Sequence, residues 1–174
     1  MPLIKDGSEI HDPYVRVTDD EAVPEEGAVL VNAARLLSGD VPERTDPLGV
    51  VWPNDRLVDE LIPHLGQLAL IALVFPKFKD GRAYSQARQL RERLGFAGEL
   101  RAIGEVLRDQ FLFMLRAGFD AFEVKKDKDA AAFAQTVKRY TVFYQPAGDD
   151  EPPAFRRRLV DGRPRRPPSP DFTI

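Results

Sequence analysis

The sequence contains no cysteine, and so it lacks the side chain on which several classes of function depend. Disulfide bonds, thiolate nucleophiles, cysteine-ligated zinc and ordinary iron–sulfur clusters are all excluded. Histidine is scarce as well: only His11 and His64 are present, which argues against a transition-metal site with two or more histidines. A carboxylate site for Mg²⁺ needs neither residue type and stays open.

Long apolar segments are lacking too. The longest run, residues 68–75, is far too short to cross a bilayer as a helix. The N-terminus has no basic stretch followed by an apolar run and a cleavage site, so the sequence predicts no signal peptide, a cytoplasmic protein and no membrane partner. The net charge of −3 favours neither nucleic acid nor a membrane surface as partner of the whole chain.

Cofactor-binding and catalytic motifs are also missing. Gly95, Gly98 and Gly104 are too widely spaced for a dinucleotide fingerprint, and no phosphate-binding P-loop occurs. A Ser/His/Asp triad is unsupported, because neither histidine falls in the loops where polar residues gather. The sequence therefore predicts no bound cofactor and no metal, and it leaves open whether the protein is an enzyme.

What the sequence does contain is enough chain for one domain with a substantial core, since it has 174 residues. Three segments differ in composition. Residues 1–27 are polar and acidic and predict an irregular leader with one short strand near 14–17, whereas residues 28–146 carry an α/β pattern. Residues 147–174, rich in proline and arginine, predict a disordered tail.

The central segment alternates short apolar runs with helical patterns. Asn54 or Asp55 is a candidate helix cap, Pro63 is expected to end or kink that helix, and Gly95 is expected to end the helix of residues 84–94. Predicted strands cover residues 28–31, 49–52, 68–75, 99–103, 121–124 and 141–144. Predicted helices end near 39, follow 55, cover 84–94 and 105–117, and begin at 127 or 129.

This alternation predicts an α/β fold of successive βα units. Short loops between strands and helices imply parallel pairing through right-handed crossovers. An open three-layer sandwich and an incomplete TIM-like barrel both satisfy the pattern, because strand order is not written in the periodicity. In either fold, ligands bind at the carboxyl ends of the strands.

Three loops follow predicted strands at that edge: residues 75–82, 104–110 and 123–126. In the first, Arg82 with the hydroxyls of Tyr84 and Ser85 could hold an oxyanion. Alternatively, Asp80 and Gly81 make a turn and Arg82 pairs with Asp80 or Glu105. In the second, the polar residues start an apolar helix expected to be well buried, where they either face a ligand or complement the helix dipole, with Arg108 bridging to a carboxylate.

The C-terminal tail carries six arginines broken up by prolines. A basic tail can bind nucleic acid or an acidic partner, but here no aromatic residues are interleaved for base stacking. We therefore interpret it as a solvated extension, and nucleic acid as an unfavoured partner.

The middle of the chain resembles the bacterial DUF934 family over about residues 52–144. The resemblance rests on residues 78–88, 90–96, 98–102, 104–110 and 118–122, in that order. It implies an accessory protein of assimilatory sulfite reduction, in sulfate assimilation and cysteine biosynthesis, with sulfite reductase as the partner. Many relatives have a cysteine before the Gly-Phe-Asp motif, where this chain has Ala117, so thiol chemistry is not its essential function.

An alternative function is a small oxyanion-binding enzyme of sulfur or phosphate metabolism. Exposure of Phe78 and Phe96 would favour a protein interface, whereas burial would make them core residues. The candidate ligand-binding residues are those of the family motifs at the strand ends: Lys77, Asp80, Arg82, Tyr84, Ser85, Arg88, Glu105, Arg108, Asp109 and Gln110.

Overall fold

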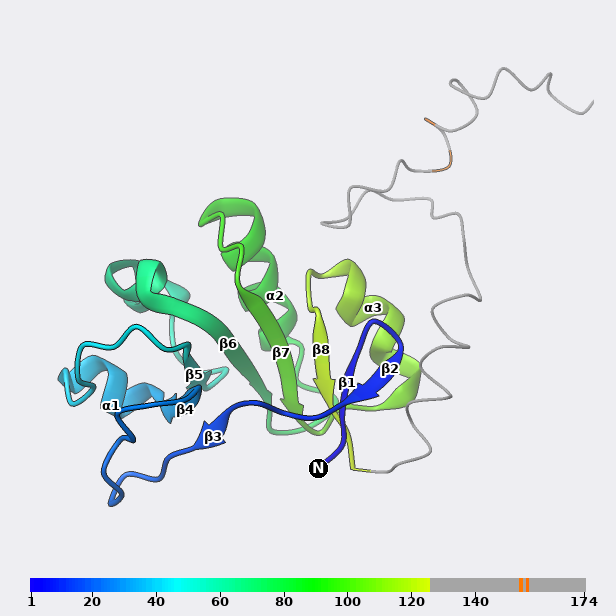
Figure 1. Cartoon of the computed structure of the whole chain (residues 1–174). Helices are drawn as coiled ribbons and strands as arrows, with labels where there is room; N and C mark the ends of the chain where they lie inside the picture. The colour runs from blue at the N-terminus through cyan, green and yellow to red at the C-terminus, as the bar shows by residue number, and fades with distance from the viewer. Residues whose placement is uncertain (126–153, 155, 157–174) are drawn as a thin grey trace, which may run out of the picture.

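Eight strands form a single sheet in the computed structural model, which describes residues 1–125 together with 154 and 156 (Figure 1). Their order across the sheet is β2-β1-β8-β7-β6-β5-β4-β3. The strands are β1 (Leu3–Lys5), β2 (Ser8–Ile10), β3 (Val15–Arg16), β4 (Val29–Asn32), β5 (Leu48–Trp52), β6 (Leu68–Phe75), β7 (Glu99–Gly104) and β8 (Ala121–Glu123).

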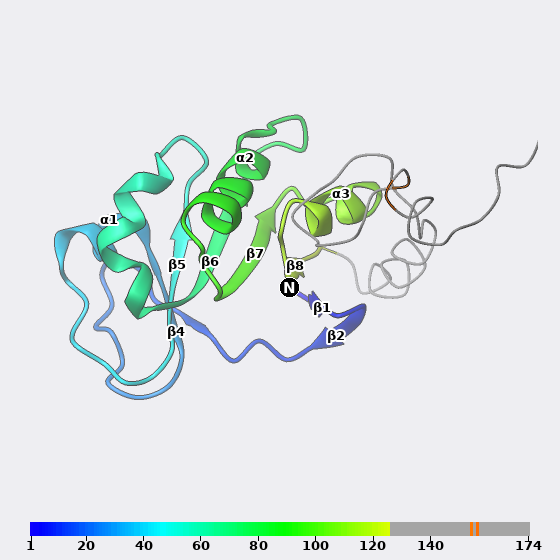
Figure 2. The same ribbon diagram turned by 90° about the horizontal axis from the view of Figure 1, so that it is seen from above.

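From β3 to β8 the strands are parallel and lie side by side in chain order. Right-handed crossovers between successive parallel strands bring their helices to the same face of a sheet, and Figure 2 shows α2 and α3 together on one side of a curled sheet. The predicted α/β class is therefore confirmed. The sheet is mostly parallel and resembles half a barrel.

The helical segments are short and several are not α-helical. They are α1 (Ala33–Ser38), the 3₁₀ helix η1 (Val58–Gln67), α2 (Arg82–Arg88), its π-helical continuation η2 (Gln89–Arg93), the 3₁₀ turn η3 (Arg108–Gln110) and α3 (Phe111–Arg116). The prediction for residues 84–94 is close to α2 with η2. Gly95 follows in the left-handed conformation expected of a helix terminator, with φ +65°.

Two helix starts were predicted wrongly. Neither Asn54 nor Asp55 caps a helix, because η1 begins only after Leu57. Of the two effects expected of Pro63, an end or a kink, the end does not occur, because Pro63 lies inside η1. The helix predicted from Glu105 begins later, at Arg108 as a 3₁₀ turn. The physical reason is that Gly104 has φ +94° and the Glu105 N–H donates to the Phe75 carbonyl at 2.8 Å, which turns the chain back to the sheet first.

The N-terminal segment differs from the irregular leader that we predicted. β1 and β2 form a hairpin, and β1 pairs antiparallel with β8, where Leu3 and Ile4 become buried. Residues 11–14, which we call the strap, then lead along the sheet to β3 (Figure 1). The short strand expected near 14–17 is β3. The predicted strand 141–144, the helix from 127 or 129 and the tail from 147 lie outside the described residues, apart from 154 and 156.

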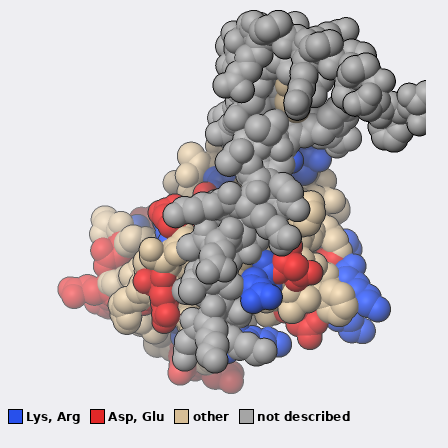
Figure 3. Space-filling view, turned by 90° about the vertical axis from the view of Figure 1, so that its right-hand side faces the viewer, with Lys and Arg blue, Asp and Glu red and all other residues tan. Residues whose placement is uncertain are grey.

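The sheet buries apolar residues on both faces. The helix-covered face carries the larger cluster, which includes the fully buried Trp52 and Phe75. The opposite, concave face carries a smaller cluster of Leu30, Leu70, Ala72 and Ile103, against which Tyr14 of the strap packs. On the side of the molecule in Figure 3, acidic and basic side chains are interspersed over the visible described surface.

Candidate functional site

The loops that follow β6 and β7 meet at Phe78. Its backbone N–H donates to the Glu105 carboxylate at 3.2 Å, and its carbonyl accepts from the Gln110 side-chain amide at 3.0 Å. We call Glu105 and Gln110 the Phe78 clamp. Because β6 and β7 are parallel neighbours, these groups come from the same edge of the sheet, as the strand-end rule predicted.

The clamp holds a large apolar side chain in solvent. The Phe78 side chain is 43% exposed, and Leu107, whose carbonyl accepts from the Gln110 N–H at 3.0 Å, is 40% exposed. Phe96, by contrast, is only 6% exposed and belongs to the core. Of the two phenylalanines singled out in the sequence, Phe78 therefore meets the expectation for an interface and Phe96 does not.

Asp80 and Arg82 pair with each other at the beginning of α2. The Arg82 guanidinium donates to both carboxylate oxygens, with the shortest contact at 2.7 Å, and the Arg82 backbone N–H donates to Asp80 at 3.2 Å. These bonds hold the pKa of the Asp80 carboxyl well below its usual range. The Asp80–Arg82 pair, which one of the two interpretations of this loop predicted, therefore forms, and it offsets the Arg82 charge.

Tyr84 lies partly in the core. Its ring meets Phe75 edge-on at 5.3 Å between centroids and Phe119 at 6.4 Å. Burial, with a smaller contribution from the nearby Asp109 carboxylate, raises the pKa of Tyr84 to about 12. The phenol is therefore neutral near pH 7 and is not poised as a general base.

The other predicted site residues separate into two groups. Ser85 and Arg88 are exposed on α2, and Arg88 pairs with Glu92 at 3.1 Å, so the structure does not bring it to the clamp. Lys77, Arg108 and Asp109 are exposed around the clamp. The expected bridge from Arg108 to a carboxylate does not form within residues 1–125.

The helix of Phe111 is less buried than its composition predicted. Phe111 and Met114 are buried, but Phe113 is 67% exposed. A six-residue helix lying on one face of a sheet covers only one stripe of side chains, so an apolar composition all round does not bury it all round.

Buried polar groups gather beside the end of β5, and sequence analysis missed them. The Gln86 amide donates to the carbonyls of Pro53 and Arg56, at 3.0 and 2.9 Å. The buried Asn54 side chain interacts with the Asp80 carboxylate, whereas Gln86 Oε1 and Trp52 Nε1 are buried without a hydrogen-bond partner within the described residues. Such atoms can bind a small polar molecule or water. The available signal was a glutamine on the buried side of α2, between Ala83 and Ala87.

A charged network on the concave face was also missed. Arg101 is completely buried on β7 and bonds to Glu99 at 3.0 Å and to Asp12 of the strap at 2.7 Å. Arg101 also lies over the Tyr14 ring, 5.5 Å from its centroid. The network continues with two further pairs, Lys5–Glu99 at 2.8 Å and Arg16–Glu123 at 2.7 Å. The signal was the polar position 101 alternating with apolar Leu100 and Ala102 in β7.

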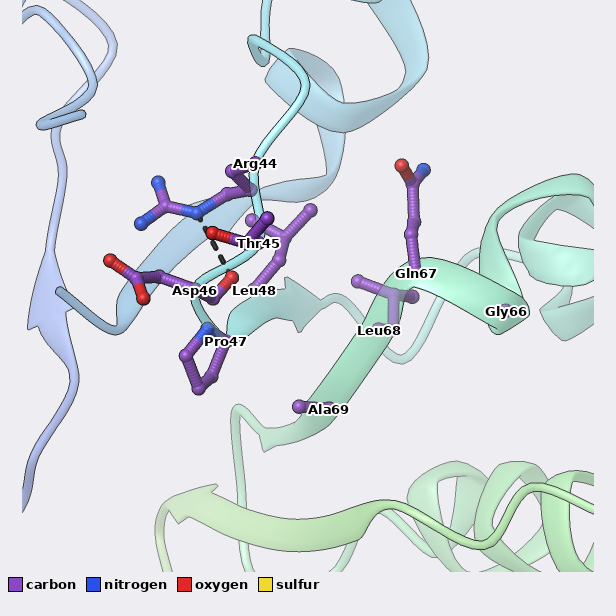
Figure 4. A pocket seen from close by; sticks show the side chains of 9 residues that line it. All are labelled: Arg44, Thr45, Asp46, Pro47, Leu48, Gly66, Gln67, Leu68 and Ala69. Atoms are coloured by element: carbon purple, nitrogen blue, oxygen red, sulfur yellow. Dashed lines mark hydrogen bonds between the residues drawn. The ribbon is translucent and has the colours of Figure 1, made fainter. Parts of the chain in front are cut away.

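An open pocket of about 380 Å³ lies at the opposite edge, where β5 and β6 begin (Figure 4). It is lined by residues 44–48 and 66–69. Arg44, its one cationic side chain, donates to the Asp46 carbonyl at 3.2 Å and to the Pro24 carbonyl at 3.1 Å. Its guanidinium therefore fixes the backbone of neighbouring loops, and the amino edge of a parallel sheet is where such structural contacts are expected.

Two searches over the described residues bear on metals and membranes. No group of three or more histidine, aspartate or glutamate residues in this part of the chain is arranged to hold a metal ion. Nor is any helix of the described part long and apolar enough to cross a bilayer.

Comparison with known proteins gave one family. The family model described as "Bacterial protein of unknown function (DUF934)" matches residues 49–155, which is more than half of the chain. A search of curated proteins found no match.

Proposed function

Because the chain belongs to the DUF934 family of bacterial proteins of unknown function, we propose its function from the sheet edge that the family model covers. The protein is an accessory protein of assimilatory sulfite reduction, and it binds sulfite reductase through the edge that presents Phe78. The structural part of this proposal is a protein-binding edge. The sulfur-assimilation part comes from the family resemblance in the sequence.

A binding role is supported by Phe78, whose side chain is exposed while its main chain is held by hydrogen bonds. An aromatic side chain 43% in solvent has no packing reason to be held there, yet both main-chain polar groups of Phe78 are hydrogen-bonded to the clamp. Aromatic anchors dominate many protein interfaces, and fixing them before binding reduces the conformational entropy lost on association. The clamp thus supports a docking residue.

Sulfite reductase as the partner fits the composition of the chain. A protein without cysteine supplies no thiolate ligand for an iron–sulfur cluster, so a role beside a redox enzyme is easier to support than a role as its electron carrier. A cytoplasmic location and the absence of a resident cofactor are parts of the same proposal.

A small oxyanion-binding enzyme is the second candidate. The buried unpartnered atoms of Trp52 and Gln86 favour it, because one N–H donor and one acceptor could bind a small oxygen-containing molecule. Against it, the cations beside these atoms are already paired: Arg56, which lies over the Trp52 ring, with Glu60, and Arg82 with Asp80. The docking function therefore has the better support.

We also propose that the curled sheet is an incomplete TIM-like barrel and not an open three-layer sandwich. The chain-order arrangement of β3 to β8 supports this choice, because a doubly wound sandwich reverses strand order within the sheet. In barrels of this kind, binding loops occupy the carboxyl edge, which is the edge of Phe78.

Growth and binding experiments test the proposal together. A deletion strain of the source bacterium should grow on sulfide but not on sulfate or sulfite, and the purified protein should bind the sulfite reductase holoenzyme. The variant Phe78→Asp should lose binding and fail to restore growth. Phe113→Asp, which changes another exposed phenylalanine, should behave like the wild type. Normal growth of the deletion strain on all three sulfur sources, without measurable binding, would refute the proposed function.

A further inference from the structure

At the carboxyl edge, unlike elsewhere in the described residues, several basic side chains form no ion pair. Lys77 and Lys79 follow β6, Arg108 follows β7, and Lys125 follows β8; all four are exposed. None of them forms an ion pair with any residue of the range 1–125, and Lys79 lies over the Phe78 ring, 5.6 Å from its centroid. β6, β7 and β8 are parallel neighbours, so the four cations share one edge.

Elsewhere in residues 1–125, basic side chains are bonded to carboxylates or to backbone carbonyls. Carboxylates or backbone carbonyls hold Lys5, Arg16, Arg35, Arg44, Arg56, Arg82, Arg88, Arg91, Arg93 and Arg101. At the edge itself Asp80 is matched by Arg82, and the remaining carboxylates, Asp55, Glu105 and Asp109, are fewer than the four cations that are unpaired within residues 1–125. Within residues 1–125, the unpaired positive charge thus lies at the ends of β6, β7 and β8, around the exposed Phe78 and Leu107.

From this distribution we propose that the carboxyl edge binds an acidic segment of a partner protein, one whose apolar side chains receive Phe78 and Leu107. The proposal deepens the proposed function by stating the chemistry of the partner, and it rests on that function in taking a protein as the partner. Complementary charge at the rim of an interface speeds association and selects the partner, while the aromatic centre provides most of the affinity.

A protein segment fits this edge better than nucleic acid does. Nucleic-acid sites neutralise a run of phosphates and usually stack bases on several aromatic rings. Here the centre is apolar, formed by the exposed side chains of Phe78 and Leu107, and Asp109 and Glu105 lie among the cations. Carboxylates that alternate with apolar side chains match the pattern of the edge.

Fluorescence anisotropy with the full chain tests the proposal without sulfite reductase. The probe is a labelled peptide in which glutamate alternates with leucine. Its control peptide has glutamine at every glutamate position, and a single-stranded oligonucleotide of equal charge is the competing ligand. The variant Arg108→Glu is compared with Arg93→Glu, which makes the same charge change at an exposed arginine that is paired with Asp59.

The glutamate peptide should bind about tenfold more tightly than the glutamine peptide at low salt and should weaken towards physiological salt. Arg108→Glu should weaken it about fivefold, and Arg93→Glu less than about twofold. Three results overturn the proposal: equal or undetectable binding of the two peptides, equal effects of the two variants, or tighter binding of the oligonucleotide. Peptide binding that persists while sulfite reductase fails to bind would instead refute only the proposed function.

Discussion

Two charged regions of the same sheet differ in whether their cations are paired with carboxylates. On the concave face, the cations Lys5, Arg16 and Arg101 are each bonded to a carboxylate, and Arg101 is inaccessible to solvent. At the carboxyl edge, cations around Phe78 stay exposed and unpaired within residues 1–125. Matched and buried charge contributes to folding, whereas unmatched and exposed charge remains available to a partner.

The largest effect is expected at the concave face. Arg101→Met should lower the free energy of unfolding by about 3–5 kcal/mol, because it leaves the carboxylates of Asp12 and Glu99 without their buried partner. Denaturant unfolding measures the change. The control Arg93→Met, which removes an exposed ion pair, should cost less than about 1 kcal/mol. Equal costs for the two variants would remove the distinction between the regions.

At the carboxyl edge, a change in backbone geometry should alter the stability of the fold more than a change in charge does. Gly104→Ala should destabilise the protein by roughly 1–3 kcal/mol, because Gly104 has φ +94° and an added Cβ would lie 2.5 Å from the Phe75 carbonyl oxygen. Gly81→Ala is the matched control, since an added Cβ there meets nothing within 4 Å. Thermal unfolding compares the two, and a larger loss in Gly81→Ala would contradict this account of the β7 end.

The Asp80–Arg82 pair should make a smaller, pH-dependent contribution. Folding lowers the pKa of the Asp80 carboxyl. The stability that the pair contributes is therefore present above the unfolded carboxyl pKa of about 3.9, and it is lost as the pH falls below that value. Unfolding midpoints measured from neutral to acid pH should therefore fall less steeply for Asp80→Asn than for the wild type. An unchanged pH profile in Asp80→Asn would show that the pair adds nothing.

The smallest effect is expected at Tyr84. Its pKa of about 12 means that a titration of tyrosine absorbance should contain a late component that disappears in Tyr84→Phe. The sign for stability follows from the raised pKa: the contribution is full below the unfolded value of about 10 and is lost as the pH rises towards 12. If Tyr84→Phe instead removes a component that titrates near the ordinary tyrosine pKa of about 10, the phenol is exposed to solvent and the account of its burial is wrong.

Elements with an unbroken local signal were predictable from the sequence. β6 covers residues 68–75 as expected, because a continuous apolar run between a glutamine and a proline leaves few alternatives. The delayed start of the helix after Gly104 was not predictable. Glu105 has a good helical propensity, but its carboxylate and its N–H are used across the chain, on Phe78 and Phe75.

The location of the candidate site was predictable from the sequence, but the pairing of its side chains was not. The strand-end rule brought residues 76–82 and 104–110 to one edge, and the structure joins them at Phe78. The sequence offered the Asp80–Arg82 pair as one of two alternatives, but the rule could not foresee that Arg88 pairs with Glu92 away from the clamp. Arg101 was missed because a lone charged residue in a strand resembles a solvent-facing position. Its burial depends on Asp12 and Tyr14, far away in the sequence.

Hydrogen exchange of the full chain, with and without sulfite reductase holoenzyme, tests the central claim most directly. The account predicts that binding slows exchange at amides of residues 76–79 and 105–110, around the Phe78 clamp, and leaves the strap and β7 unchanged. Protection confined to the strap and the concave face, or no protection at the clamp, would contradict a docking edge at the carboxyl ends of β6 and β7.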